Sequence, residues 1–247
     1  MLSQSNLSRP KITVVSIAKT DEELEDLRNA LSKQTFQDFE FVTSTKRTIP
    51  EAWNDAISRS HGEFIVFTES DAIPMSNEWL QDIAKHVKRN AVLKGLEINP
   101  TDMNLCNLVC DASIFERIRF DESFPISEDT ELFARLRRFG VKIERINSFP
   151  VIHSPTQTWN KTLSRGLMRG VLLMKIVYLH GRQNIDDVNT RGFKGRRIDP
   201  VSNRVRIITE NLLVLFGLLI GAICYLPLAA KHKSNMRNGL KYDVESA

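Results

Sequence analysis

The first 70 residues alternate between short apolar runs that favour strands and amphipathic runs that favour helices. Strands are predicted at residues 12–18, 39–43 and 63–68, with helices opening near Thr20 and spanning residues 50–60 between them. This strand–helix–strand–helix–strand order indicates a parallel, doubly wound sheet with right-handed crossovers. The predicted fold class is therefore α/β, with a mostly parallel central sheet flanked by helices.

The third predicted strand runs directly into two carboxylates, Glu69 and Asp71, one residue apart. In a strand, residues i and i+2 point to the same side, and ligands of such sheets bind beyond the carboxyl ends of the strands. Close carboxylates repel unless a cation lies between them, and Mg²⁺ or Mn²⁺ bridging substrate phosphates would neutralise them. The alternative for the pair alone is a solvated turn with Pro74 just beyond it.

The α/β pattern continues to residue 146. Gly140 is suited to the position just after the C-terminus of a helix, and the acidic residues after Ser127 are suited to the first turn of a helix. We expect helices at residues 79–88 and 127–139 and strands at 92–98, 105–111 and 141–146, of which 105–111 is either an edge or a returning strand.

The C-terminal part of the chain is apolar and flanked by basic residues. Leu212–Ala230 contains 19 residues without a charge, which is the lower limit for a helix that crosses a bilayer. Pro227 near its end keeps a buried core helix or a re-entrant segment as alternatives. Basic residues are nearly balanced on its two sides, so the positive-inside rule gives no clear orientation.

The segment Lys161–Arg182 predicts an amphipathic helix. Lys161, Arg165 and Arg169 form a basic row at a spacing of four beside an apolar face. Such a helix either lies in a membrane interface or packs on the domain like any amphipathic helix.

Composition is ordinary for a globular protein, and 247 residues suit one domain with an appendage. The net charge of +4 is a mild basic excess that suits phosphate-bearing substrates or an anionic membrane surface. Cys106, Cys110 and Cys224 imply neither a disulfide framework nor a zinc site. The polar first ten residues do not look like a secretory signal.

Several short motifs occur in register over residues 11–154, and together they resemble family 2 glycosyltransferases of the GT-A fold. The matching segments are LEDLRNALSKQTF at residues 24–36, AWNDAI at 52–57, HGEFIVF at 61–67, FDESF at 120–124, EDTEL followed by Arg135 at 128–135, and VIH at 151–153.

The resemblance implies transfer of a sugar from a nucleotide-activated donor with inversion at the anomeric carbon, assisted by Mn²⁺ or Mg²⁺. It gives Glu69-Ser70-Asp71 the place of the family's D-x-D, with Asp71 as the more direct metal ligand and His153 as a further ligand. Asp129 is the expected base, with Glu128 as the second choice. Contacts to the donor or acceptor are expected from Ala18, Thr43, Asn54, Glu69 and Arg135.

Three departures from the family pattern leave donor choice and metal dependence open. Thr43-Ser44-Thr45 stands where members often carry an Asp that contacts the nucleobase, Trp53 replaces an Arg, and Glu69 replaces the first Asp. A catalytically weak GT-A-like module that assists an active transferase at the membrane is therefore the alternative function. A nucleotidyltransferase is disfavoured because residues 16–20 lack a glycine-rich loop.

The expected organisation places the catalytic domain in the cytoplasm, next to a membrane, with a lipid-linked or glycan acceptor and no nucleic acid partner. The expected parts are an N-terminal tail (1–10), the GT-A domain (11–155), a basic amphipathic region (156–206), a transmembrane or membrane-inserted helix (207–230) and a C-terminal tail (231–247).

Overall fold

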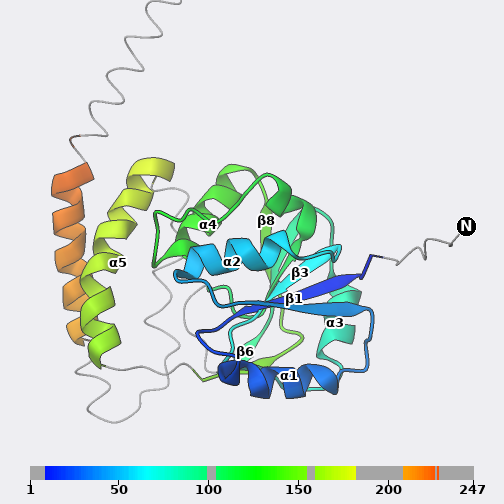
Figure 1. Cartoon of the computed structure of the whole chain (residues 1–247). Coiled ribbons are helices and arrows are strands. Elements are labelled where there is room, and N and C mark those ends of the chain that lie inside the picture. The colour runs from blue at the N-terminus through cyan, green and yellow to red at the C-terminus, as the bar shows by residue number, and fades with distance from the viewer. Residues whose placement is uncertain (1–8, 99–103, 155–158, 182–207, 226, 228–247) are drawn as a thin grey trace, which may run out of the picture. The chain divides into compact units, whose positions relative to one another are not determined.

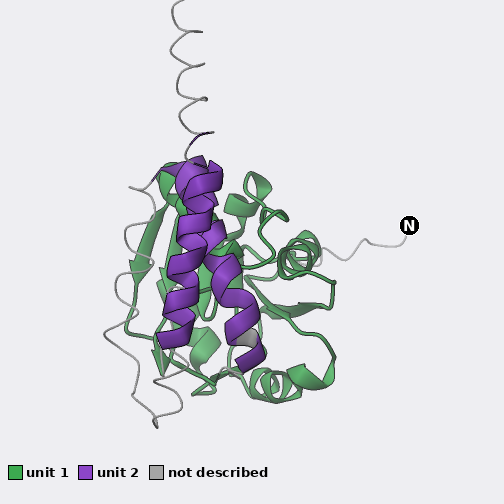
Figure 2. Ribbon diagram, turned by 90° about the vertical axis from the view of Figure 1, so that its left-hand side faces the viewer, with its two compact units in different colours: residues 1–156, 188–197 green, residues 157–187, 198–247 purple. Residues whose placement is uncertain are grey.

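The computed structural model describes residues 9–98, 104–154, 159–181, 208–225 and 227. The chain divides into two compact units, one within residues 1–156 and 188–197 and the other within residues 157–187 and 198–247 (Figure 2). The predicted C-terminal tail, all of residues 182–206 and most of the N-terminal tail lie outside the described residues.

The first unit is built on a six-stranded sheet in the order β2-β1-β3-β7-β5-β8 (Figure 1). All strands run in one direction except β7, which pairs antiparallel with both neighbours. The expected mostly parallel sheet is thus confirmed, and β7 is a returning strand inside the sheet. The bounds are β1 Ile12–Ile17, β2 Phe39–Ser44, β3 Phe64–Phe67, β5 Ala91–Lys94, β7 Leu108–Asp111 and β8 Lys142–Arg145.

Helices cover both faces of this sheet. Neighbouring residues of a strand point to opposite faces, so Val15 packs with Trp53 and Phe133, while Val14 packs with Leu27 and Trp79. One face therefore lies under α2 and α4 and the other under α1 and α3. The bounds are α1 Glu25–Ser32, preceded by the 3-10 turn η1 Glu22–Leu24, α2 Ile49–Ser58, α3 Trp79–His86, η2 Ala112–Glu116 and α4 Glu128–Arg138.

A second, three-stranded sheet has the order β4-β9-β6, with bounds Ala72–Pro74, Val151–His153 and Glu97–Ile98. The prediction of one strand over residues 92–98 is wrong, because the chain leaves the main sheet at Gly95 and enters the small one. A Cβ at Gly95 would meet the ring of Phe149 at 2.2 Å and Nδ2 of Asn107 at 2.4 Å, so only glycine fits this crossing.

The second unit contains the expected amphipathic helix, α5 (Trp159–His180), and a second helix whose described part begins at Ile208. Ile208–Tyr225 is long enough and apolar enough to cross a membrane by length and composition. Glycines bring the two backbones together: a Cβ at Gly170 would lie 2.2 Å from the carbonyl oxygen of Val214, and one at Gly217 would lie 2.1 Å from that of Leu167.

Candidate functional site

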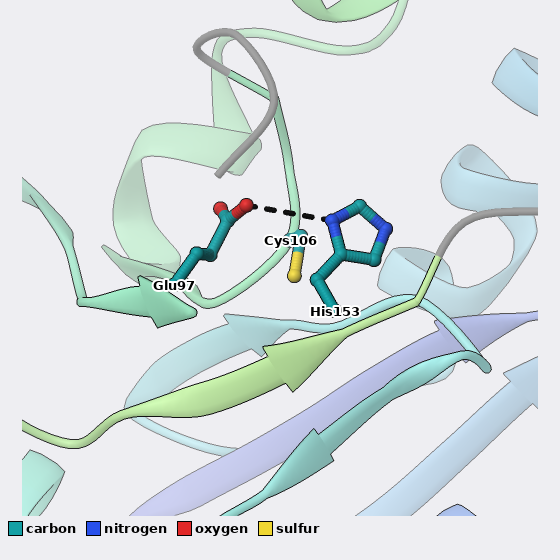
Figure 3. Close-up of side chains that lie close together, drawn as sticks. All are labelled: Glu97, Cys106 and His153. Carbon is teal, nitrogen blue, oxygen red and sulfur yellow. Dashed lines mark ion pairs between the residues drawn. The ribbon is translucent and has the colours of Figure 1, made fainter. Parts of the chain in front are cut away.

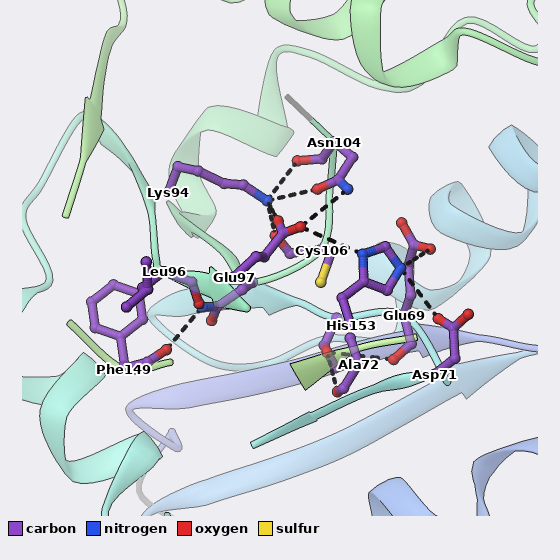
Figure 4. A network of polar contacts seen from close by, with 12 residues as sticks. Glu69, Asp71, Ala72, Lys94, Leu96, Glu97, Asn104, Cys106, Phe149 and His153 are labelled. Carbon is purple, nitrogen blue, oxygen red and sulfur yellow. Dashed lines mark hydrogen bonds and ion pairs between the residues drawn. The ribbon is translucent and has the colours of Figure 1, made fainter. Parts of the chain in front are cut away.

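The turn after β3 carries the two predicted metal carboxylates. The N–H of Ala72 donates to the carbonyl of Glu69 over 3.0 Å, which closes the turn. β4 begins at Ala72 and pairs with β9, so that Ala72 stands opposite His153. Asp71 is also tied to this strand, since its carbonyl accepts from the N–H of Ser154 over 3.1 Å. The pairing therefore brings Glu69 and Asp71 to the imidazole (Figure 4).

His153 lies between three carboxylates, and its side chain is only 3% exposed. Its Nε2 lies 3.3 Å from Oε2 of Glu69 and 3.5 Å from Oδ1 of Asp71, and its Nδ1 lies 3.4 Å from Oε2 of Glu97. These are ion-pair distances, and neither ring nitrogen has a well-directed hydrogen bond to a described residue. Burial lowers the pKa of this imidazole, but the three carboxylates outweigh it and raise the pKa to about 11.

Glu69, Asp71 and His153 fit a divalent metal ion. One ligand atom of each lies within 4.8 Å of the other two, and neighbouring ligands of an octahedral ion bound at about 2.1 Å are about 3 Å apart, so small side-chain movements suffice. Two carboxylates with one imidazole suit Mn²⁺ or Mg²⁺ better than a thiol-preferring metal. The buried Nε2, which lacks a directed partner and lies next to both carboxylates, supports the same fit.

Behind His153 lies a buried charged network that the sequence prediction missed. Lys94, the last residue of β5, and Glu97, the first residue of β6, form an ion pair with side chains 4% and 3% exposed. Lys94 Nζ also donates to Oδ1 of Asn104 over 2.6 Å and to the backbone carbonyl of Cys106. The sequence contains one hint of this network, since Lys94 and Glu97 are two opposite charges, three residues apart, in an otherwise apolar run.

A second group, Glu97, Cys106 and His153, also brings three potential metal ligands together (Figure 3). The ammonium of Lys94 already lies against Glu97 and occupies the place of a cation. Burial raises the pKa of the Cys106 thiol, so the sulfur stays protonated and is a poor metal ligand. The first group is therefore the better metal site.

Because β1, β2 and β3 are parallel, their carboxyl ends lie at the same end of the main sheet. Ala18 follows β1 and donates its N–H to the carbonyl of Ser44 over 3.2 Å. Thr43 lies in β2 opposite Ser16. Ala18 and Thr43 thus lie at the same end of the sheet as Glu69, which follows β3. Ligands of such sheets bind beyond the carboxyl ends of the strands.

The other predicted residues lie on α2 and α4. Glu128 and Asp129 form the first turn of α4, where Oδ1 of Asp129 accepts from the N–H of Thr130 over 2.6 Å. Asn54 on α2 bonds both the N–H and the carbonyl of Phe120, over 2.9 and 3.0 Å.

Arg135 is held within α4 and against the preceding loop. It pairs with the buried Glu131 through two contacts of 2.6 Å and donates to the carbonyl of Arg119. Asn54 and Arg135 thus have evident structural contacts, and their predicted substrate contacts stay predictions.

No protein-family model matches the chain, and no curated protein matches it by sequence. Solved structures match it by fold. A mannosyltransferase from Pyrobaculum calidifontis, in complex with GDP-Man and Mn²⁺, has a TM-score of 0.56 at 14% identity over 96% of this chain and 81% of that chain. S. aureus TarS 1–349 has a TM-score of 0.53 at 14% identity, covering 84% of this chain and 80% of that one.

The complex of TarS 1–349 with UDP-GlcNAc also has a TM-score of 0.53, at 13% identity over 81% of this chain and 79% of that chain. At these identities the likeness shows the fold. The α/β architecture of this chain, with its mostly parallel central sheet, therefore resembles that of proteins that have been solved with nucleotide sugars.

Proposed function

We propose that the chain is an inverting glycosyltransferase of the family 2, GT-A type, which moves a sugar from a nucleotide-activated donor to an acceptor hydroxyl or phosphate. One observation carries this proposal. The group of Glu69, Asp71 and His153 lies where β3 ends, in a fold that resembles a mannosyltransferase solved with GDP-Man and Mn²⁺. Ligands of such sheets bind beyond these strand ends.

Asp71, Glu69 and His153 would hold the metal ion, Mn²⁺ or Mg²⁺. When bound, such an ion neutralises the charge of the departing diphosphate as a Lewis acid. Both carboxylates have side chains that are 38% exposed, so the donor can approach from their side, whereas His153 supports them from the interior. Ala18 and Thr43, at the same sheet edge, are proposed to contact the donor nucleotide.

Asp129 is proposed as the general base, with Glu128 as the second choice. The acceptor oxygen attacks the anomeric carbon from the side opposite the diphosphate, and its proton passes to the carboxylate. The bond between the anomeric carbon and the donor phosphate oxygen breaks, and its electron pair leaves with the diphosphate. A single displacement of this kind inverts the anomeric configuration and forms no covalent enzyme intermediate. Asn54 and Arg135 are proposed to help bind the substrates.

The acceptor is proposed to be lipid-linked, and the catalytic unit to work on the cytoplasmic side of a membrane. The support is the apolar helix Ile208–Tyr225 packed beside the basic helix α5. An acceptor held in a bilayer would then meet a catalytic unit held at the same surface.

The test is transfer from GDP-mannose and UDP-GlcNAc to a polyprenyl phosphate by the full chain with Mn²⁺. Asp71→Ala and Asp129→Asn should each lower the rate by about 100-fold or more, because one loses a metal ligand and the other the base. Asp26→Asn removes an exposed carboxylate on α1 and should keep the wild-type rate. Equal rates in all four proteins would contradict the assignment.

A catalytically weak partner module is the second candidate, and the substitution of Glu69 for the usual first Asp favours it. Calorimetric titration of GDP and UDP with and without Mn²⁺ separates the two. The transferase requires nucleotide binding that depends on the metal, whereas metal-independent binding or none supports the partner role.

A further inference from the structure

The ion pair of Lys94 and Glu97 is almost fully buried, between the last residue of β5 and the first residue of β6. Lysine and glutamate are almost never fully buried unless paired, and replacing a buried ion pair by apolar residues of similar size is often neutral or stabilising. The side chains of Lys94 and Glu97 are only 4% and 3% exposed. The contacts that the pair makes beyond itself therefore indicate its purpose.

Both carboxylate oxygens of Glu97 have partners. Oε1 contacts Nζ of Lys94, and Oε2 lies 3.4 Å from Nδ1 of His153. Lys94 is held in turn by Oδ1 and the carbonyl of Asn104, over 2.6 and 3.3 Å, and by the carbonyl of Cys106. Asn104 donates to Oε2 of Glu97 over 3.5 Å (Figure 4). The carboxylate is thus fixed from one side and faces the imidazole with the other.

The two nitrogens of His153 therefore have separate tasks. Nδ1 faces Glu97, and an ionised carboxylate accepts hydrogen bonds but cannot donate them. The proton of a neutral imidazole therefore belongs on Nδ1. When a metal ion takes the place of the proton on Nε2, this nitrogen presents its lone pair to the side where Glu69 and Asp71 lie. Carboxylates that hold the distal N–H of a metal-binding histidine fix its tautomer and its orientation.

We propose that Glu97 is a positioning residue that directs Nε2 of His153 at the metal, and that Lys94 keeps Glu97 in place and cancels its charge. The inference rests on the proposed metal site of Glu69, Asp71 and His153. Because Lys94 neutralises Glu97, a divalent ion is drawn to the carboxylates of Glu69 and Asp71 and not to the interior. The network connects the main sheet, through β5, to the small sheet, through β6 and β9.

The first test is Glu97→Gln, measured as Mn²⁺ binding by electron paramagnetic resonance on the full chain without any donor. The amide oxygen of glutamine stays with the ammonium of Lys94, so its NH₂ faces Nδ1 of His153 and requires that nitrogen to accept. The proton then moves to Nε2 and blocks the lone pair. We expect the Kd for Mn²⁺ to rise by about 10- to 100-fold, the range for loss of a supporting carboxylate.

The second test separates positioning from folding. The double variant Lys94→Met, Glu97→Leu replaces the ion pair by an apolar pair and should unfold at or near the wild-type temperature. It should nevertheless weaken Mn²⁺ binding as strongly as Glu97→Gln. Asp111→Asn removes another nearly buried carboxylate, at the opposite end of β3, and should leave the Kd unchanged.

A spectroscopic measurement reports the tautomer directly. In the Mg²⁺-loaded wild type, ¹⁵N NMR of the His153 ring should show the proton on Nδ1, and in Glu97→Gln it should show the proton on Nε2. Variants with an unchanged tautomer and a Kd within about twofold of wild type would overturn the proposal, as would a wild type that binds no Mn²⁺. If the variants lose Mn²⁺ as expected but no donor sugar is transferred, only the proposed function fails.

Discussion

At the scale of the residue, the nearly buried Asp111 shows how a carboxylate is kept charged inside the fold. It is the last residue of β7 and accepts from the N–H groups of Asn90 and Ser113, over 2.7 and 3.1 Å, while Arg89 lies 3.5 Å away. Burial raises the pKa of this carboxyl, but these donors and the guanidinium outweigh it and lower the pKa below its ordinary value. The carboxylate is therefore a source of stability that depends on pH.

Asp111→Asn should remove this dependence. Because the folded-state pKa is the lower one, the stabilisation is complete above the unfolded value of about 3.9 and is lost as the pH falls through the folded-state pKa. The variant should lose about 1–3 kcal/mol at neutral pH and show a flatter decline in stability below pH ~4. Urea unfolding of the full chain from pH 6 to pH 3 measures this. Asp26→Asn, on the exposed side of α1, controls for the loss of one charge. A free energy of unfolding that fell in parallel with pH in Asp111→Asn and in the wild type would contradict the argument.

At this scale the sequence predicted the carboxylates Glu69 and Asp71 as metal ligands because they end an apolar strand. It placed His153 with them only through a family resemblance, since the contact depends on the pairing of β4 with β9. Lys94 and Glu97 escaped it because a charged residue in an apolar run gives no information about its distant partners. Those partners, Asn104 and Cys106, come from a segment that no local pattern connects to β5.

At the scale of the element, the long strands and helices of the first unit follow from periodicity, whereas the small sheet does not. β4, β9 and β6 have three, three and two residues. Runs this short contain no measurable alternation, and they form because the chain around them is held by tertiary contacts. Asn107 is the main contact of this kind: Nδ2 donates to the carbonyls of Leu96 and Phe149 over 3.0 and 2.8 Å, and Oδ1 accepts from Nε1 of Trp79.

Asn107→Ala should therefore destabilise the chain by about 2–4 kcal/mol, because it leaves the buried Nε1–H of Trp79 and carbonyl of Phe149 without partners. The loss should be accompanied by faster hydrogen exchange in β6 and β9, which Leu96 and Phe149 flank. Thermal unfolding and exchange mass spectrometry measure the two effects. Asn29→Ala, at an exposed position of α1, is the matched control. Exchange that rises equally in all strands would show that Asn107 does not act on the small sheet in particular.

The glycines between α5 and the helix at Ile208–Tyr225 allow a second prediction at this scale. A Cβ at Gly170 would meet backbone atoms of Val214 and Leu218 at 2.2 and 2.7 Å, whereas one at Gly166 would meet the side chain of Leu213 at 2.9 Å. Gly170→Ala should therefore separate the helices clearly, whereas Gly166→Ala, which meets Cβ of Leu213 at 2.9 Å, should need a shift of only a few tenths of an ångström.

Cross-linking of cysteines placed at Tyr178 and Tyr225, whose rings stack at 6.0 Å in the native pair, measures the separation. The cross-link should form in the background of Gly166→Ala and be strongly reduced with Gly170→Ala. Equal yields in both backgrounds would mean that the close approach at Gly170 is not required.

At the scale of the whole molecule, the direction of these two helices limits how the chain meets a membrane. Gly166 lies against Leu213, Gly170 against Gly217, Met174 against Gly221 and Tyr178 against Tyr225, so the helices run parallel. If both crossed a bilayer, the connecting residues 182–207 would have to cross it backwards, and they carry seven Arg and Lys residues. Charged residues cost several kcal/mol each in a bilayer centre. Arg165, Arg169 and Lys175 on α5 add to that cost.

The packed pair is therefore expected to lie along the membrane surface, with large exposed side chains of the second helix, Leu212, Leu215, Phe216, Leu219 and Ile223, in the lipid. In this arrangement the C-terminal tail would lie on the same side of the membrane as the first unit. Single cysteines at Lys241 and at Asp26, in a Cys224→Ser background, should both react with a membrane-impermeant maleimide when the full chain is added to sealed anionic vesicles.

Replacement of the lipid-facing Leu219 by Arg should release the chain from these vesicles. The free-energy cost of placing a charge in the lipid exceeds the free energy that the helix gains by binding to the surface. Phe139→Arg removes an equally exposed large apolar residue at the end of α4 and should leave binding unchanged. A tail cysteine that reacts only after detergent is added would place the tail across the bilayer. The helix at Ile208–Tyr225 would then have to leave α5 in order to span, and the glycine contacts would describe a state that exists only off the membrane.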